Sequence, residues 1–144
     1  MFAKEAIDAR TESKGVAFER AMERAARLFE EMGSGARDGD GVTRDPYGKG
    51  EQFAHDILIR EGRQLGLEVY IDEALNTWLT WPGKNRTLPR ILLGSHLDSV
   101  PRGGNYDGLA GVLVALAVVE TLKAEARNPR CDIVILALRG EENA

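Results

Sequence analysis

The sequence has little cysteine and no long hydrophobic run. Its 144 residues include one cysteine, Cys131, which excludes an internal disulfide and a zinc module built from several cysteines. The longest apolar run, residues 109–119, is much shorter than the roughly 20 residues that a membrane span needs. The N-terminal residues lack the apolar segment of a secretory signal. We therefore expect a soluble, cytoplasmic protein that does not enter a membrane.

The chain also lacks an excess of positive charge. The chain carries 19 Lys and Arg residues against 23 Asp and Glu residues, so its formal net charge is −4. The basic residues are scattered among acidic ones and form no patch of the kind that binds nucleic acid or acidic lipid. Hydrophobic residues make up 43% of the chain, which suffices for the core of one domain of this length. Nucleic acid and membranes are therefore excluded as partners.

The hydrophobic pattern predicts an α/β fold with a mixed, largely parallel sheet flanked by helices. Helical spacing of apolar residues predicts helices over residues 13–32, 51–65 and 109–122. Alternating or continuous apolar residues predict strands over residues 67–71, 76–81, 91–94 and 133–138. The last two strands are continuous apolar runs, which is typical of strands covered on both faces. The polar, glycine-rich residues 33–41 are expected to form a flexible connector.

A histidine and two carboxylates surround one short loop. Residues 94–101 read GSHLDSVP after an apolar strand, and residues 103–108 read GGNYDG before an apolar helix. A metal-bound imidazole is normally held through its other nitrogen, so His96 and Asp98 fit a ligand and its partner. Asp107 lies at the positive end of the helix, which favours the ionised form that binds a divalent cation. The alternatives are a hydrogen-bonded histidine at a strand end and an aspartate that only caps the helix.

Two successive carboxylates, Glu141 and Glu142, follow the strand over residues 133–138. One of them could hold a metal ion while the other accepts a proton from a water molecule that the ion activates. The alternative for such a pair is a solvated acidic loop. The three elements together favour a metal site, because all of them fall at strand ends that should face the same crevice.

The segments GSHLDSVP and GGNYDG resemble the metal-site signature of the family of N-carbamoyl-L-amino-acid hydrolases, allantoate amidohydrolases and beta-ureidopropionases. This family is the amidohydrolase branch of the aminoacylase and carboxypeptidase metallopeptidase superfamily. The likeness extends from residue 41 onward, where GVTR and the strand near residues 67–76 also resemble family segments. It implies the fold of a dinuclear-zinc exopeptidase-like catalytic domain.

The resemblance also implies a role for each residue of the motif. His96 would bind one metal ion, Asp107 would bridge two ions, and Glu142 would bind the second ion. Asp98 would orient His96, and Glu141 would act as the general base. The cofactors would be two divalent ions, zinc before manganese, cobalt or nickel. The resemblance assigns no residue of this sequence to substrate binding.

The histidine count limits what this chain does alone. The family needs two further histidines downstream, but the only other histidine, His55, is expected to face solvent on its helix. The family also reads Asp-Glu-Glu-Gly where this chain reads Gly140-Glu141-Glu142-Asn143. Residues 1–144 are therefore interpreted as the N-terminal portion of a catalytic domain, truncated after the glutamate pair and without the family's inserted dimerisation domain. The parent protein would be a homodimer.

The predicted function is metal-dependent hydrolysis of linear C–N bonds in small ureido or amide substrates, such as N-carbamoyl amino acids or allantoate-like ureides. We expect the fragment alone to be inactive. One alternative is an aminoacylase or metallopeptidase of the same superfamily. The other is a non-catalytic domain that binds a ligand or partner; such a module should fold cooperatively, whereas a fragment with an exposed sheet edge should aggregate.

Overall fold

The computed structural model describes the backbone of residues 2–142 and the side chains of residues 15–142. Its elements in chain order are α1 (Phe2–Ser34), β1 (Arg37–Asp38), β2 (Gly41–Val42), α2 (Lys49–Gln64), β3 (Glu68–Ile71), β4 (Thr77–Trp81), β5 (Ile91–His96), α3 (Leu109–Ala124) and β6 (Ile133–Leu138). The predicted helices and strands are thus confirmed, with shifted ends. Strand β5 continues to His96, two residues beyond the predicted end.

The main sheet has the strand order β3-β4-β6-β5. Strands β3 and β4 are antiparallel because a short turn joins them, and β4 is also antiparallel to β6. Among the strands that the structure describes, β5 and β6 alone run parallel, since α3 forms the crossover between them. The mixed sheet is confirmed, whereas the expectation that it is largely parallel is wrong for the described residues.

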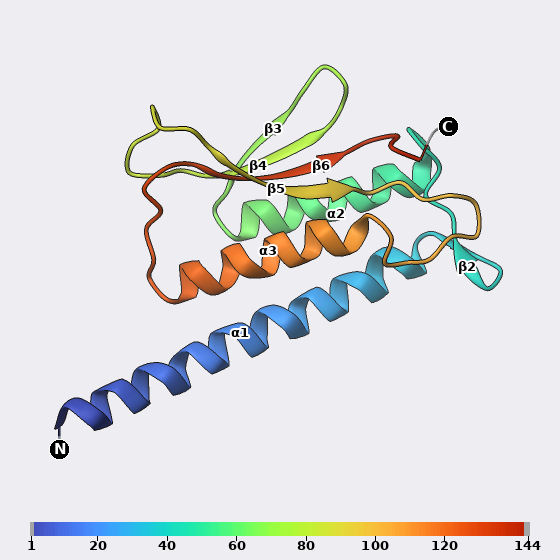
Figure 1. The fold of residues 1–144 in the computed structure, drawn as a ribbon. Coiled ribbons are helices and arrows are strands. Elements are labelled where there is room, and N and C mark those ends of the chain that lie inside the picture. The colour runs from blue at the N-terminus through green and yellow to red at the C-terminus, as the bar shows by residue number, and fades with distance from the viewer. Residues whose placement is uncertain (1, 143–144) are drawn as a thin grey trace.

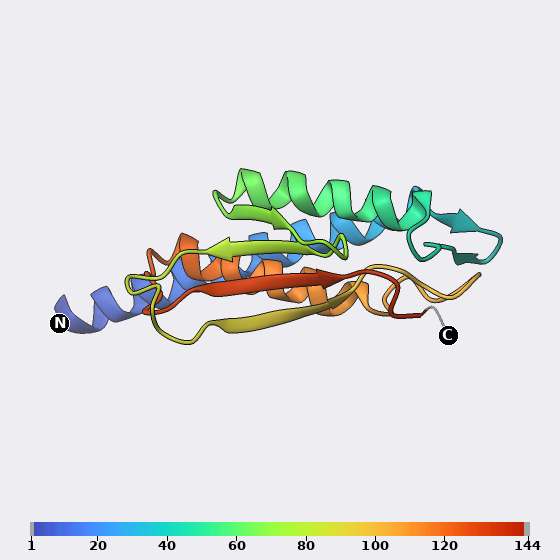
Figure 2. The ribbon, with the colours of Figure 1, turned by 90° about the horizontal axis from the view of Figure 1, so that it is seen from above.

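Helices α2 and α3 cover one face of this sheet, and α1 packs against α3 on the side away from the sheet (Figures 1 and 2). Helix α3 therefore packs on two sides, with Leu109, Val112 and Leu113 fully buried, whereas Val114 and Val118 are exposed. The core lies between these helices and the inner side chains of the strands, such as Leu79 and Ile135. No helix among residues 2–142 is both long and apolar enough to cross a membrane.

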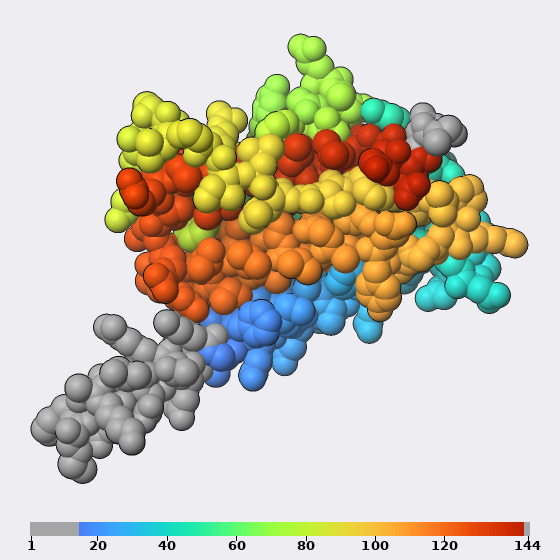
Figure 3. Space-filling model, viewed as in Figure 1, coloured from blue at the N-terminus to red at the C-terminus, as the bar shows by residue number. Residues whose placement is uncertain are grey.

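Strand β5 lies at the edge of the sheet, and β5 and β6 reach the surface of the face shown in Figure 3. Ile91 is 49% and Leu92 51% exposed. The prediction that both apolar strands are covered on both faces is therefore wrong for β5. It holds for the middle of β6, where Val134 and Ile135 are fully buried. The difference arises because α2 and α3 lie on the same face and β5 is paired on one side only.

The glycine-rich residues 33–41 are more ordered than the expected flexible connector. Strands β1 and β2 form a small antiparallel ladder, in which Arg37 pairs with Val42. Val42 also forms a bridge with Gly103, through two backbone hydrogen bonds of 3.1 and 2.9 Å. This bridge brings the chain after β2 against the loop between His96 and Asp107.

Candidate metal centre

The imidazole of His96 is held from one side by Asp98. His96 ends β5 and is 8% exposed, and Asp98 is fully buried in the loop that follows. His96 Nδ1 lies 3.2 Å from the backbone oxygen of Asp98 and 3.3 Å from its Oδ1. Both neighbours are acceptors, so they favour the tautomer with the hydrogen on Nδ1, which leaves the Nε2 lone pair available. Asp98 thus lies where a residue that orients a metal-bound His96 would be expected.

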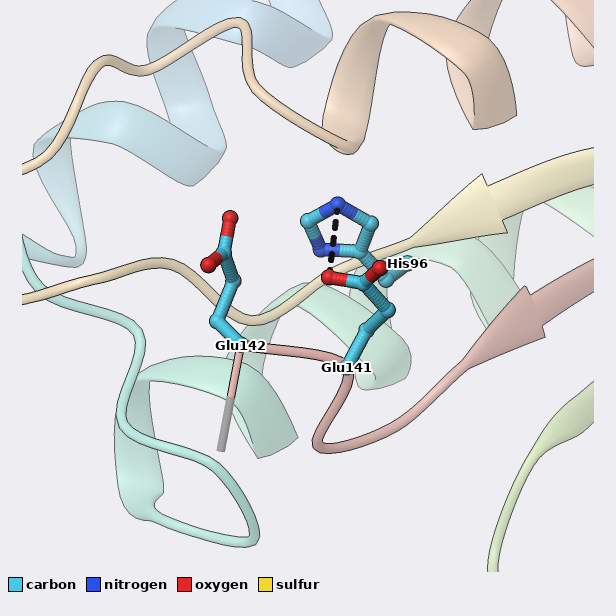
Figure 4. Close-up of side chains that lie close together, drawn as sticks. All are labelled: His96, Glu141 and Glu142. Atoms are coloured by element: carbon cyan, nitrogen blue, oxygen red, sulfur yellow. Dashed lines mark ion pairs between the residues drawn. The ribbon is translucent and has the colours of Figure 1, made fainter. Parts of the chain in front are cut away.

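Three carboxylates approach His96 Nε2 from two different loops. Asp107 Oδ1 lies 3.9 Å from Nε2, and Glu141 Oε2 lies 3.8 Å from it. One ligand atom each of His96, Glu141 and Glu142 lies within 4.8 Å of the others, and Figure 4 shows both glutamates beside the histidine ring. Two ligand atoms of one tetrahedral zinc ion are separated by roughly 3.4 Å, so these oxygen and nitrogen donors need to move little to share an ion.

Asp98 joins the two loops. Its Oδ2 accepts a hydrogen bond of 2.8 Å from the backbone N–H of Glu142. Its Oδ1 is buried and has no hydrogen-bond partner that meets normal geometry in the described part of the chain, apart from its position beside His96 Nδ1. An unsatisfied buried oxygen next to an imidazole N–H fits a ring whose orientation tightens when Nε2 binds a cation. The donor set therefore fits a divalent ion.

Gly108 allows Asp107 to approach His96. Helix α3 begins at Leu109 with Gly108 as its N-cap residue, so Asp107 does not occupy the capping position that the alternative interpretation gave it. Gly108 has a φ of 64°, and a Cβ atom there would lie 2.5 Å from the His96 ring. Both the positive φ and the close packing require glycine. Asp107 itself is 63% exposed and its carboxylate faces the site.

A buried glutamate that the sequence pattern did not reveal anchors the loop of Glu141 and Glu142. Glu51, on α2, is fully buried and accepts hydrogen bonds from the backbone N–H groups of Tyr47 (2.7 Å) and Gly140 (3.0 Å). It also pairs with Arg139 Nη1 at 3.0 Å. The segment that Glu51 holds thus ends at Gly140, one residue before Glu141. The sequence offered no signal for it, because Glu51 lies among ordinary first-turn residues of a helix.

The expectation that His55 faces solvent is wrong. The side chain is fully buried between α2 and β4, where Nδ1 and Thr77 Oγ1 share a hydrogen bond of 2.7 Å. Burial, and to a smaller extent the charge of Arg139, lowers the pKa of His55 to about 3. His55 is not part of the metal-ligand group among the described residues. It is a neutral core residue, because the α2 face that carries it packs on the sheet.

His55 should make the stability of the chain depend on pH. The folded state takes up a proton here only near pH 3, whereas an unfolded histidine does so near its ordinary pKa of 6.5. Stability is therefore complete above that value and falls as the pH drops, by at most about 1.4 kcal/mol per pH unit from this proton. Urea unfolding of the wild type and His55→Gln measures the effect. The free energy of unfolding of His55→Gln should change less with pH than that of the wild type. Equal slopes for the two proteins would contradict the lowered pKa of His55.

The sequence-predicted site residues thus come together at one end of β5 and β6. His96, Asp107, Glu141 and Glu142 share a space, and Asp98 lies behind it. The Asn143 position, where the chain departs from the family pattern, lies outside the described residues. These side chains are the candidate donors of a partial coordination shell in the described part of the chain.

The chain is similar in sequence to known proteins. Residues 76–144 match Peptidase family M28. The chain is 37% identical over 118 residues to an N-carbamoyl-L-amino acid amidohydrolase of Geobacillus stearothermophilus, which covers 82% of this chain and 29% of that protein. It is 34% identical over 110 residues to the allantoate amidohydrolase of Bacillus subtilis, which covers 76% of this chain and 27% of that protein.

A solved structure shows the same fold. A hydantoinase/carbamoylase family amidase from Burkholderia ambifaria matches with a TM-score of 0.80 and 31% identity, over 85% of this chain and 30% of that one. The chain therefore spans less than a third of the length of these relatives. Sequence identity, fold and the arrangement of the motif residues confirm the resemblance: the chain belongs to the hydantoinase/carbamoylase family of amidohydrolases, together with the N-carbamoyl-L-amino-acid and allantoate amidohydrolases.

Proposed function

We propose that residues 1–144 form part of the catalytic domain of a metal-dependent hydrolase that cleaves linear C–N bonds. Its substrates would be N-carbamoyl amino acids or allantoate-like ureides, as the names of the relatives suggest. The observation that carries the proposal is the position of His96 Nε2, which faces Asp107 and Glu141 at 3.9 and 3.8 Å while Asp98 holds Nδ1. The parent protein would be a cytoplasmic homodimer.

Each residue has a distinct role in the proposed reaction. His96, Asp107 and Glu142 would hold two divalent ions, zinc before manganese, cobalt or nickel, together with ligands from outside this chain. Bound ions of this kind polarise a substrate carbonyl and lower the pKa of water. Glu141 accepts the proton of the attacking water and donates it to the leaving nitrogen. Asp98 keeps the Nδ1–H tautomer of His96, so that Nε2 stays available as a ligand.

A peptidase or aminoacylase is the second candidate, because the matched family model is that of peptidases. Both candidates use the same histidine and carboxylates and differ in the group that the pocket accepts. A chimera separates them, in which residues 1–144 replace the matching segment of a carbamoylase relative. We expect it to hydrolyse N-carbamoyl amino acids or allantoate. Hydrolysis of only dipeptides or N-acyl amino acids would favour the second candidate, and a folded, metal-loaded but inactive chimera would favour a non-catalytic binding domain.

Zinc binding tests the centre in the 144-residue chain itself. We expect weak binding, because His96, Asp107 and the glutamates supply a partial shell, and we expect His96→Ala to abolish it. Isothermal titration calorimetry measures both. Glu68→Gln changes an exposed glutamate at the opposite end of the sheet from His96, so it is the control and should bind zinc as the wild type does. Tight binding of two zinc ions per chain, or binding that survives His96→Ala, would contradict the proposed site.

A further inference from the structure

The guanidinium group of Arg44 lies fully buried directly behind the metal-site loop. Its Nε donates a hydrogen bond of 2.6 Å to the backbone oxygen of Leu97, and its Nη1 donates one of 3.0 Å to Asn105 Oδ1. Its Nη2 donates to the backbone oxygens of Asn105 and Asp107, both at 3.4 Å. The side chain therefore binds the loop at both ends, next to His96 at one end and at Asp107 at the other.

The backbone of Arg44 binds the same loop. Its N–H donates to Ser99 Oγ at 3.0 Å, and its C=O accepts from the backbone N–H of Ser99 at 3.0 Å. Asn105 also links the loop to α1, because its Nδ2 donates a hydrogen bond of 2.9 Å to the backbone oxygen of Phe29. The loop is thus hydrogen-bonded to Arg44 at four residues, Leu97, Ser99, Asn105 and Asp107, and to α1 at one, Asn105.

Burying the charged guanidinium of Arg44 removes it from water, which is unfavourable. Its hydrogen bonds show which part of the structure the buried group stabilises. All of the guanidinium hydrogen bonds described above go to uncharged oxygens, so no hydrogen-bonded ion pair offsets the free-energy penalty of removing the guanidinium from water. Burial lowers the pKa of Arg44, and the nearby charges of Asp98 and Asp107 oppose that change. None of these bonds goes to the strands or helices of the core. The interactions of Arg44 concentrate on one loop.

We propose that Arg44 is a positioning residue of the metal centre: its planar, five-donor guanidinium holds the loop from Leu97 to Asp107 so that the Asp107 carboxylate lies beside His96 Nε2. This inference rests on the proposed function, since positioning matters only if Asp107 and His96 bind an ion. A lysine keeps the charge but cannot reach carbonyls at both ends of the loop with one rigid group.

Two measurements on the 144-residue chain test the role of Arg44. In Arg44→Met, we expect hydrogen exchange of the amides in residues 97–109 to rise roughly tenfold or more, because buried carbonyls lose their donor, while amides in α2 and β4 change little. Zinc affinity should fall by roughly 10–100-fold, as it does when a supporting partner of a ligand is removed. Arg44→Lys should recover a small part of both losses.

Two further variants serve as controls. Arg102→Met removes an exposed guanidinium that belongs to the loop itself but points to Asp38, so it should leave exchange and zinc affinity unchanged. Asn105→Ala removes the acceptor of Arg44 Nη1 and the donor to the backbone oxygen of Phe29, so it loosens the same loop locally and keeps the test valid if Arg44→Met does not fold. Wild-type zinc affinity and wild-type loop exchange in the Arg44 variants would overturn the proposal, as would exchange that rises equally throughout the chain.

The failure of the proposed function has a different signature. A wild-type chain that binds no zinc would contradict the proposed metal centre. The exchange data would then still support or refute the tie between Arg44 and the loop, because they need no metal ion.

Discussion

In the chimera that carries residues 1–144, Glu141→Gln is expected to lower kcat for C–N bond hydrolysis by roughly 10²–10⁴-fold and to leave the metal content unchanged. The reason is that Gln keeps the size and hydrogen-bonding capacity of the side chain but cannot accept the proton of the attacking water. Glu141 is 56% exposed and faces the site, so the substitution leaves no buried group unpaired. Steady-state kinetics and metal analysis of the purified protein measure the two quantities.

The neighbouring glutamate provides the matched comparison. Glu142→Gln should lower metal content, because an amide is a weaker ligand than a carboxylate for a divalent ion. The geometry makes this a demanding test, since Glu141 Oε2 lies only 3.8 Å from His96 Nε2 and both glutamates belong to the same ligand group. If Glu141→Gln loses the metal while Glu142→Gln keeps it, the two roles are reversed.

Glu51→Gln is expected to lower the free energy of unfolding of the chain by about 3–5 kcal/mol, because it removes one partner of a buried ion pair. Arg139 and Glu51 are both buried, and the carboxylate also accepts the N–H groups of Tyr47 and Gly140. The amide of Gln would face some of these donors with N–H groups of its own. Urea unfolding at a concentration where the chain is monomeric measures the loss.

An exposed ion pair gives the control for this prediction. Glu68 pairs with Arg86 at 2.7 Å, but both side chains are about half exposed. Glu68→Gln should therefore change stability by no more than about 1 kcal/mol. Equal effects of the two substitutions would mean that the buried pair does not hold the Glu141 loop. A large loss confined to Glu51→Gln would support the anchoring role.

The residues proposed to bind metal could be predicted because their positions follow from local pattern and one topological rule. Apolar runs identify β5 and β6, and the crossover helix between them makes the two strands parallel. Parallel neighbours end at the same edge of a sheet, so His96 and the Glu141–Glu142 pair had to meet there. Asp107 follows from its place before the helix, although its exact approach depends on Gly108.

The supporting residues could not be predicted in this way. Arg44, Glu51 and His55 are all fully buried polar side chains. On the sequence they resemble surface residues, because charged and polar side chains are usually exposed. Their burial depends on contacts with segments far along the chain, such as the loop at Leu97, the start of the glutamate loop and Thr77. The open outer side of β5 and the antiparallel part of the sheet depend on the same long-range packing.

The sequence by itself thus determined which segments are helices and strands and which residues can bind a metal ion, since these follow from periodicity and from side-chain chemistry. The tertiary structure alone decided the antiparallel part of the sheet, the buried partners of both loops and the distances at His96 Nε2. The physical reason is that burial and hydrogen bonding of a polar group depend on which distant segments pack around it, and that information is not contained in the neighbouring residues.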